Sequence, residues 1–362
     1  MAREQTETER VASELLLTAI AFERFGSDMT SRVMEHFRAM ERDLVAVMVD
    51  IDYQAPRSKA ERDERLAALM DAAEDIVEDT YREITDEMTD DLRTVAETSE
   101  GSAVNALFLA FGAAFLVGKL RAVPVERLHD VADGVRFDGA TVSEWLSQQQ
   151  ADTFFRFKRA VMDGGSNDLT IAEIIETLTG SREAQRRDGA FQTPRRNVET
   201  LIFTAVQVVA TAARLALYEM SDGLVPAVGH LSILDSKTSQ ICMAYSGKRW
   251  RLPDYDPIGH NLPFGNATPR HFRCRSQTIP VFDLRETATG TQSSESGQVP
   301  AQWTYEDWLR SRSEEDQRDI LGPTKYDLWK RGKLSFSDLV DQRGNPLTVA
   351  ELTKRFSRRQ AD

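Results

Sequence analysis

Cysteine is nearly absent from this sequence, since only 2 of its 362 residues are cysteines. Two thiols exclude a disulfide framework, and this usage fits synthesis in a reducing cytoplasm. The first ten residues, MAREQTETER, are charged and have no apolar run behind a basic end. We therefore expect no secretory signal. The sequence shows no internal repeat and no glycine-rich loop of the kind that cradles phosphate groups.

Long hydrophobic runs are also lacking. The most apolar stretch, residues 103–118, contains one asparagine and two glycines, and it is shorter than the roughly 20 residues that span a bilayer. We interpret it as a buried helix of a bundle and expect no stable membrane span. A membrane-active or partner-docking segment is the alternative interpretation.

Basic residues are outnumbered, with 45 Lys and Arg against 58 Asp and Glu, for a net charge of −13. The excess is concentrated in residues 61–100, which hold 15 acids and 4 arginines. We interpret this stretch as a solvated helix face, with a surface that docks on a basic partner or stays clear of DNA as the alternative. Because phosphate attraction needs clustered Lys and Arg, we expect no non-specific DNA binding by this half and no sequence-specific nucleic-acid binding.

Helical periodicity dominates the first half of the chain. Apolar residues recur at gaps of three and four over residues 8–50 and again over 66–95, which predicts two long amphipathic helices paired as a hairpin. Capping boxes predict helix starts at Thr141 and Thr170. Thr193 followed by Pro194 predicts a central helix that ends at Ser221. Residues 123–139 are interpreted as a loop.

The composition changes after Gly223. Residues 225–234, 248–252 and 278–282 are strand candidates, and the segment 253–269 between them, with four prolines and two glycines, is a loop that needs a staple. Residues 286–302 are small and polar, and we interpret them as a flexible linker. The expected fold is mainly α with a small α+β module. A helical arm (1–122) precedes the module (123–285, core 230–283), in which the central helix packs on a small antiparallel sheet closed by a Cys/His loop. The linker and a helical tail (303–362) follow.

Both cysteines lie near a histidine in the module. Cys242 is followed by His271 and, three residues later, by Cys274. Thiolate and imidazole are ligands that zinc prefers, so we predict a structural zinc ion bound by these three residues. The fourth ligand stays open: His260 is the first candidate, and Asp235 is the alternative, either as a carboxylate ligand or as an acceptor for the His271 N–H. The competing interpretation treats the cysteines as small buried apolar residues and His271 as a turn cap.

The remaining polar residues of this region have simpler interpretations. Asp235 and Thr238 form an Asp-x-x-Thr pattern that predicts a side-chain-to-backbone turn after a strand. Arg270, Arg273 and Arg275 are expected to pair with acids of the same domain, with an acidic partner or DNA as alternatives, and Arg275 is expected to orient the turn by hydrogen bonding. The isolated histidines are interpreted as ordinary surface or core residues; they are His36, His129 and His230.

Taken together, the order and spacing of these residues resemble the core signature of the Mu F-like phage head morphogenesis family, the minor head (minor capsid) proteins of tailed phages. The resemblance covers about 50 residues and extends loosely through the helix before it and the Trp308 segment after it. The matching residues are Asp235, Thr238, Cys242, Gly247, Pro269, His271, Cys274 and Arg275.

The resemblance implies a virion protein of the head interior or portal vertex, made in the host cytoplasm and present in few copies. Its partners would be the portal protein, a scaffold or the major capsid protein. It would act in procapsid assembly and DNA packaging by binding rather than catalysis, and some members enter the cell with the DNA.

A metal-dependent nuclease or a delivered effector is the alternative function. Cysteine, histidine and aspartate together also invite a cysteine-nucleophile interpretation. A nuclease of the HNH type needs a general-base histidine free of the structural ion and a carboxylate on the catalytic metal. Only His260 is available as that base, and no acid follows Asp256 in the loop. We therefore expect no enzyme and assign no catalytic residue.

Overall fold

The computed structural model describes residues 6–51, 58–221, 223–265, 267–285 and 291–358. The chain divides into two compact units. Unit 1 comprises residues 1–20, 96–128 and 210–362, and unit 2 comprises residues 21–95 and 129–209. These units do not follow the contiguous segments expected from the sequence, because three long helices each contribute residues to both. These helices are α1 (Glu7–Ile51), α2 (Lys59–Phe111) and α7 (Gln192–Met220).

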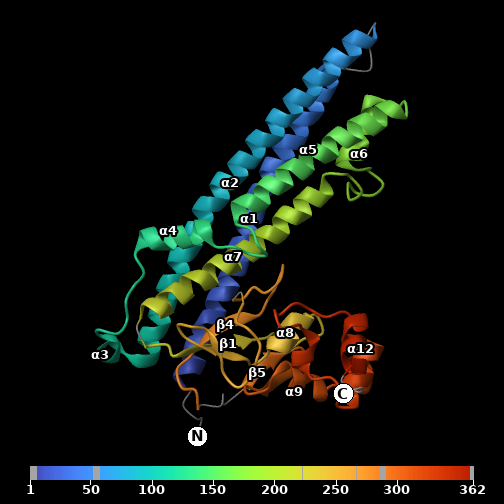
Figure 1. The fold of residues 1–362 in the computed structure, drawn as a ribbon. Coiled ribbons are helices and arrows are strands. Elements are labelled where there is room, and N and C mark those ends of the chain that lie inside the picture. The colour runs from blue at the N-terminus through green and yellow to red at the C-terminus, as the bar shows by residue number, and fades with distance from the viewer. Residues whose placement is uncertain (1–5, 52–57, 222, 266, 286–290, 359–362) are drawn as a thin grey trace. The chain divides into compact units, whose positions relative to one another are not determined.

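Unit 2 is helical and is built on the predicted apolar stripes. Its parts of α1, α2 and α7 lie side by side with α5 (Val142–Ser166) (Figure 1). The Phe37 ring of α1 meets Tyr81 of α2 edge-on at 5.8 Å, and the Tyr81 hydroxyl lies 2.8 Å from Thr153 Oγ1 of α5. The stripe residues are at most 2 % exposed: Met29, Val33, Phe37, Met40, Leu44, Met48, Leu69, Ala73, Val77, Ile84, Met88 and Leu92.

Both capping boxes form as predicted. The Thr141 hydroxyl accepts from Glu144 N at the start of α5, and Thr170 does the same for Glu173 at the start of α6 (Ile171–Thr179). The loop expected over 123–139 is wrong in part, because α4 (Val125–Gly134) lies within it. A proline can precede a helix as readily as it breaks one, and the Pro124 carbonyl accepts the first helical bond of α4.

Unit 1 contains the predicted antiparallel sheet. Its strand order is β3-β2-β1-β4, with β1 (Ala227–Leu231) between β2 (Arg249–Arg251) and β4 (Gln277–Val281). The short edge strand β3 (Asp256–Pro257) lies in the segment interpreted as a loop. Arg214 of α7 donates to Gln277 of β4, and the Thr8 hydroxyl of α1 accepts from Phe282 N at 3.3 Å. The sheet thus joins segments from both ends of the chain.

The flexible linker expected over 286–302 is wrong for its second half. Residues 286–290 lie outside the described residues, but β5 (Thr291–Ser294) and β6 (Gly297–Pro300) form an antiparallel hairpin. Gly297 has φ 105° at the turn, a conformation that glycine adopts without strain. The Glu295 carboxylate accepts from Ser236 N at 2.7 Å. The hairpin is therefore attached to the module.

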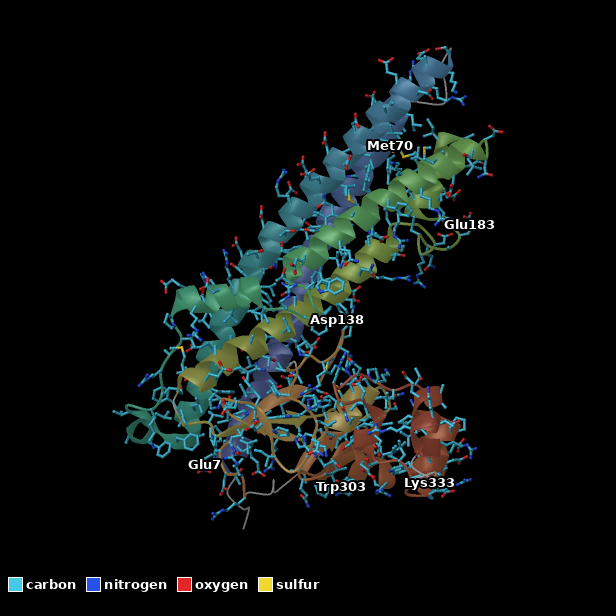
Figure 2. All side chains as sticks on the ribbon, viewed as in Figure 1. Glu7, Met70, Asp138, Glu183, Trp303 and Lys333 are labelled. Carbon is cyan, nitrogen blue, oxygen red and sulfur yellow. The ribbon has the colours of Figure 1, made fainter. Side chains whose placement is uncertain are left out.

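The tail consists of short helices: α9 (Tyr305–Arg310), α10 (Glu314–Leu321), α11 (Pro323–Lys330), the 3-10 turn η1 (Phe336–Leu339) and α12 (Val349–Arg358). Figure 2 marks Trp303 and Lys333 in this part of unit 1. The Tyr305 hydroxyl donates to the Asp235 carbonyl at 2.8 Å, and Tyr305 N donates to Ser246 Oγ at 2.8 Å. The tail therefore packs on the module around the buried Tyr305 and Trp308 rings.

The apolar stretch 103–118 is only partly the buried helix that we expected. It comprises the last turns of α2 and the short helix α3 (Ala113–Leu116), separated by Gly112 with φ 75°. Ala103, Ala106 and Leu107 are buried, whereas Leu109 and Val117 are 64 % and 78 % exposed. Within the described ranges, α7 is the one helix long and apolar enough to cross a membrane, and 72 % of its apolar window is buried.

Candidate metal centre

Two segments of unit 1 bring the predicted ligands together. Cys242 lies on α8 (Gln240–Tyr245), whose N-cap Ser239 accepts from Cys242 N at 3.3 Å. His271 and Cys274 lie in the loop before β4, in a tight turn closed by a hydrogen bond from Cys274 N to the His271 carbonyl at 3.1 Å. An H-x2-C spacing in one turn lets both side chains point to one side.

The three ligand atoms are close enough to share an ion. Cys242 Sγ lies 3.5 Å from Cys274 Sγ and 3.4 Å from His271 Nε2, and the three atoms all lie within 4.8 Å of one another. Tetrahedral zinc at its usual bond lengths places such atoms about 3.5–3.8 Å apart. The cysteines are 2 % and 3 % exposed. This Cys-His-Cys group could hold a metal ion, and it is the one such group among the described residues.

The imidazole is oriented for binding through Nε2. His271 Nδ1 lies 2.9 Å from the Phe272 carbonyl, so Nδ1 carries a proton, and in the neutral ring Nε2 holds the lone pair that a metal ion would accept. Burial alone would lower the pKa of His271, but the hydrogen bond and charge of Cys274 raise this pKa above its ordinary value.

The pKa values of the two thiols are shifted in opposite directions. The pKa of Cys274 is lowered to about 4, because the Cys242 thiol donates to its sulfur and His271 lies beside it, although burial opposes this shift. The pKa of Cys242 is raised well above its ordinary value by the same hydrogen bond, by burial and by the neighbouring charge of Cys274. Cys274 is therefore the thiol that loses its proton more readily, and Cys242 must also lose its proton for both sulfurs to bind an ion.

Two serines at the centre were missed by the sequence analysis. The Ser239 hydroxyl lies 2.7 Å from His271 Nε2. Ser239 and the buried Ser276 both lower the pKa of Cys242 through hydrogen bonds to its sulfur. The N-cap pattern at Ser239, just before the helix that bears Cys242, is the signal that could have identified it.

Arg270 does not pair with an acid, contrary to our expectation. Its guanidinium carbon lies 3.7 Å from the centroid of the Tyr245 ring, and Nε–H donates to His230 Nδ1 at 3.2 Å. Burial lowers the pKa of Arg270 to about 10, while the charges of Tyr245, Cys242 and Cys274 raise it. The buried cation therefore offsets negative charge on the two thiols.

His230 belongs to the same buried environment. It is 3 % exposed, and burial, Arg270 and His271 lower its pKa well below the ordinary value. The ring is therefore neutral and accepts the Arg270 hydrogen bond through Nδ1. This agrees with its interpretation as a core histidine.

His260 does not lie with the ligands, so the structure does not support it as the fourth ligand. Its Nε2 lies 2.9 Å from the Arg249 carbonyl, and its Nδ1 accepts from Leu262 N at 3.2 Å. The ring packs edge-on against Trp250 at 5.0 Å. Nε2 ties the loop to β2 and Nδ1 closes a turn within the loop, so neither nitrogen is free to act as a general base.

Asp235 is likewise engaged elsewhere. Its carboxylate accepts two hydrogen bonds from Arg275, at 2.6 and 3.0 Å, and one from Lys237 N at 3.0 Å. Thr238 Oγ1 lies 2.6 Å from the Ile233 carbonyl and 3.0 Å from Asp235 Oδ1. The predicted side-chain-to-backbone turn is present, and Arg275 pairs with an acid of the same unit, as expected. Burial would raise the pKa of Asp235, but Arg275 lowers it.

Gly247 and Pro269 complete the signature. Gly247 has φ 71°, and a Cβ added there would lie 3.0 Å from Thr304, so the tail can approach the turn only because glycine occupies this position. Gly247 N donates to the His230 carbonyl at 3.0 Å. Pro269 follows a cis peptide bond and leads the loop into the H-x2-C turn.

No protein-family model, curated protein sequence or solved structure matches this chain. What the protein does has to be inferred from the side chains that converge at the centre.

Proposed function

We propose that this protein is a minor head protein of a tailed phage, which acts in procapsid assembly and DNA packaging at the portal vertex by binding rather than catalysis. One observation supports this proposal above others: the residues that carry the resemblance to the Mu F-like family converge in one small module. Arg275 pairs with Asp235 across 40 positions of sequence, and Cys242 meets Cys274 across 32. These two contacts hold the segment from Asp235 to α8 against the loop before β4.

In this proposal the ion is a structural Zn²⁺ held by Cys242, His271 and Cys274. When bound, it would fix the loop that joins β3 to β4 and offset the ordering entropy of a segment with little apolar content. Since His260 and Asp235 are engaged elsewhere, a solvent molecule is the simplest fourth ligand.

The proposed partners are the portal protein, a scaffold or the major capsid protein, and the proposed location is the head interior or portal vertex. The acid-rich residues 61–100 lie on α2. Such a face repels phosphate groups, which would allow the protein to remain beside packaged DNA, or to leave with it, without adhering to it.

Co-sedimentation with the portal protein encoded beside this chain tests the proposal. The wild-type protein is expected to sediment with portal rings and with procapsids. Absence from both fractions would refute the assignment to the head. Metal analysis of the purified protein tests the ion separately, with one zinc per chain expected in the wild type and none in Cys242→Ser.

The alternative, a metal-dependent nuclease or delivered effector, would need a free general base. His260, the candidate for that role, has both ring nitrogens in hydrogen bonds. Purified protein incubated with DNA and Zn²⁺, Mg²⁺ or Mn²⁺ is therefore expected to leave the DNA intact. Cleavage that is abolished by His260→Ala, in a variant that melts like the wild type, would favour the nuclease.

A further inference from the structure

Helix α2 ends and α3 begins within unit 1 (Figure 1), and four large apolar side chains of these two helices and the residues next to them are exposed. We name these side chains the apolar tip, which consists of Phe108, Leu109, Phe115 and Val117, and they are 42 %, 64 %, 46 % and 78 % exposed. Among the described residues, Val117 and Leu109 are the most exposed large apolar side chains. A patch of this kind usually marks an interaction surface.

The fold holds the apolar tip in place. Leu116 and Val123 are buried, at 2 % and 5 % exposure, while their neighbours Phe115 and Val117 point outward. Val123 N donates to Glu100 Oε1 at 3.0 Å. A second backbone N–H of the segment is also bound, because Arg121 N donates to Oγ of Ser221, the residue after α7, at 3.1 Å.

The aromatic rings of the segment are also fixed. Phe115 stacks on Phe111 at 5.0 Å, and Phe111 meets Phe282 edge-on at 4.7 Å. The Phe115 ring therefore cannot turn inward without breaking its stacking on Phe111.

The charge of the segment that bears the apolar tip differs from that of the rest of the chain. Although the sequence has 58 acids, none lies between Glu100 and Glu126, and Lys119 and Arg121 lie within that interval. Both cations are exposed. Lys119 Nζ lies 3.8 Å above the Phe115 ring, so a cation stands directly beside an exposed aromatic side chain.

This combination identifies the kind of partner. A segment with exposed aromatic and aliphatic groups and with Lys and Arg as its only charged residues is what an interfacial contact uses on a membrane with anionic headgroups. A symmetric pairing of two copies through this patch would instead bring the cations of one copy against those of the other.

We propose that the apolar tip docks on the surface of an anionic phospholipid bilayer. Leu109, Phe115 and Val117 enter the boundary between headgroups and acyl chains, and Lys119 and Arg121 lie at the phosphate level. The α3 helix has 4 residues, so the contact is interfacial and does not span the bilayer. The proposal is independent of the metal centre and of any role in the phage head.

Vesicle flotation tests this proposal with the full-length protein. The wild type is expected to float with vesicles of equal parts phosphatidylglycerol and phosphatidylcholine, and much less with phosphatidylcholine alone. Phe115→Ser combined with Val117→Ser is expected to lower the partition coefficient at least about tenfold. Lys119→Glu combined with Arg121→Glu is expected to lower it at least about 30-fold on the anionic vesicles.

The control variants carry substitutions of the same kinds at exposed positions outside the apolar tip. Phe155→Ser alters an aromatic residue of unit 2 that is 59 % exposed, and Arg331→Glu with Lys333→Glu reverses two exposed charges of the tail. Both controls are expected to float like the wild type. Since all substituted positions are exposed, unchanged thermal melts establish that the variants fold.

Three results would overturn the proposal. The first is a wild-type protein that does not float with the anionic vesicles. The second is a loss of flotation in the controls as large as in the apolar-tip variants. The third is a wild-type dimer in analytical ultracentrifugation that Phe115→Ser with Val117→Ser converts to monomer, because that result would make a second copy the occupant of the patch.

Discussion

Removal of the proposed zinc ion should destabilise unit 1 selectively. An ion that binds the folded state alone stabilises it by about 2.7 kcal/mol when its free concentration is 100 times Kd. For a unit of this size, each kcal/mol corresponds to about 2–4 °C in Tm. Zinc should therefore raise the Tm of unit 1 by about 5–11 °C, and chelation should reverse the shift.

Tryptophan fluorescence is a selective assay for this transition. Four of the 5 tryptophans belong to unit 1, and the fifth, Trp145, belongs to unit 2. The four are Trp250, Trp303, Trp308 and Trp329. The thermal melt followed at these side chains should shift with zinc in the wild type, and the shift should vanish in Cys242→Ser and in Cys274→Ser.

His260→Ala provides the control, since His260 lies outside the ligand group and its loss should leave the zinc-dependent shift intact. If the Tm of the wild-type protein, followed by tryptophan fluorescence, does not change with zinc, then zinc does not stabilise unit 1. A Cys242→Ser variant that keeps the shift would also refute the reasoning, because Cys242 Sγ is the atom that approaches both other ligands within 3.5 Å.

Three further predictions concern pH, the signature ion pair and helix packing. The pKa of Cys242 is raised, so its thiol keeps a proton that zinc must displace. The affinity for zinc should therefore rise about tenfold for each unit of pH increase and weaken as pH falls. Chelator competition at two pH values measures this dependence, and a Kd that does not change with pH would contradict it. Asp235→Asn should cost about 1–2 kcal/mol at neutral pH through lost hydrogen bonds and the lost pair with Arg275. The pKa of Asp235 is lowered in the folded state, so its contribution is present above its unfolded value of about 3.9 and is lost as pH falls through the folded pKa; urea unfolding that shows the same difference at acid and neutral pH would argue against this. Gly164→Ala should destabilise unit 2 by about 1–3 kcal/mol, because the new Cβ would lie 2.4 Å from Ile174 Cγ1; a circular dichroism melt at or above that of the wild type would contradict it.

The parts of the fold that repeat a pattern over many residues were predictable from sequence. The stripes of α1 and α2 recur over several turns, and each apolar residue adds to the same prediction. The capping boxes at Thr141 and Thr170 are local, since the residues that interact are three apart. The Cys-His-Cys group was predictable because few other residue types supply ligands for zinc.

The predictions that the structure contradicts concern features that depend on contacts between segments distant in sequence. The hairpin of β5 and β6 carries polar residues on most positions, because much of it is exposed, so it lacks the apolar alternation that marks a half-buried strand. His260 was a reasonable ligand from its position in the loop. Its ring direction is set by the Arg249 carbonyl and by Trp250, and no local pattern encodes that.

Arg270 shows the same limit. Its burial against Tyr245, 3.7 Å below the guanidinium, arises only when α8 and the loop before β4 meet. From the sequence it was one arginine among three in a basic stretch. No pattern among nearby residues of the sequence predicts that Arg270 donates to the neutral His230 ring or that it lies near the two thiols.

The hydrogen bond between Thr8 and Phe282 joins residues 274 positions apart, and it has a consequence for the order of events on the ribosome. Residues 21–209 contain all of unit 2, so that unit can fold while the rest of the chain is still being translated. The first residues of α1, by contrast, must wait for their β4 neighbours to emerge. Nascent chains stalled before Phe282 should therefore carry a protease-sensitive amino terminus.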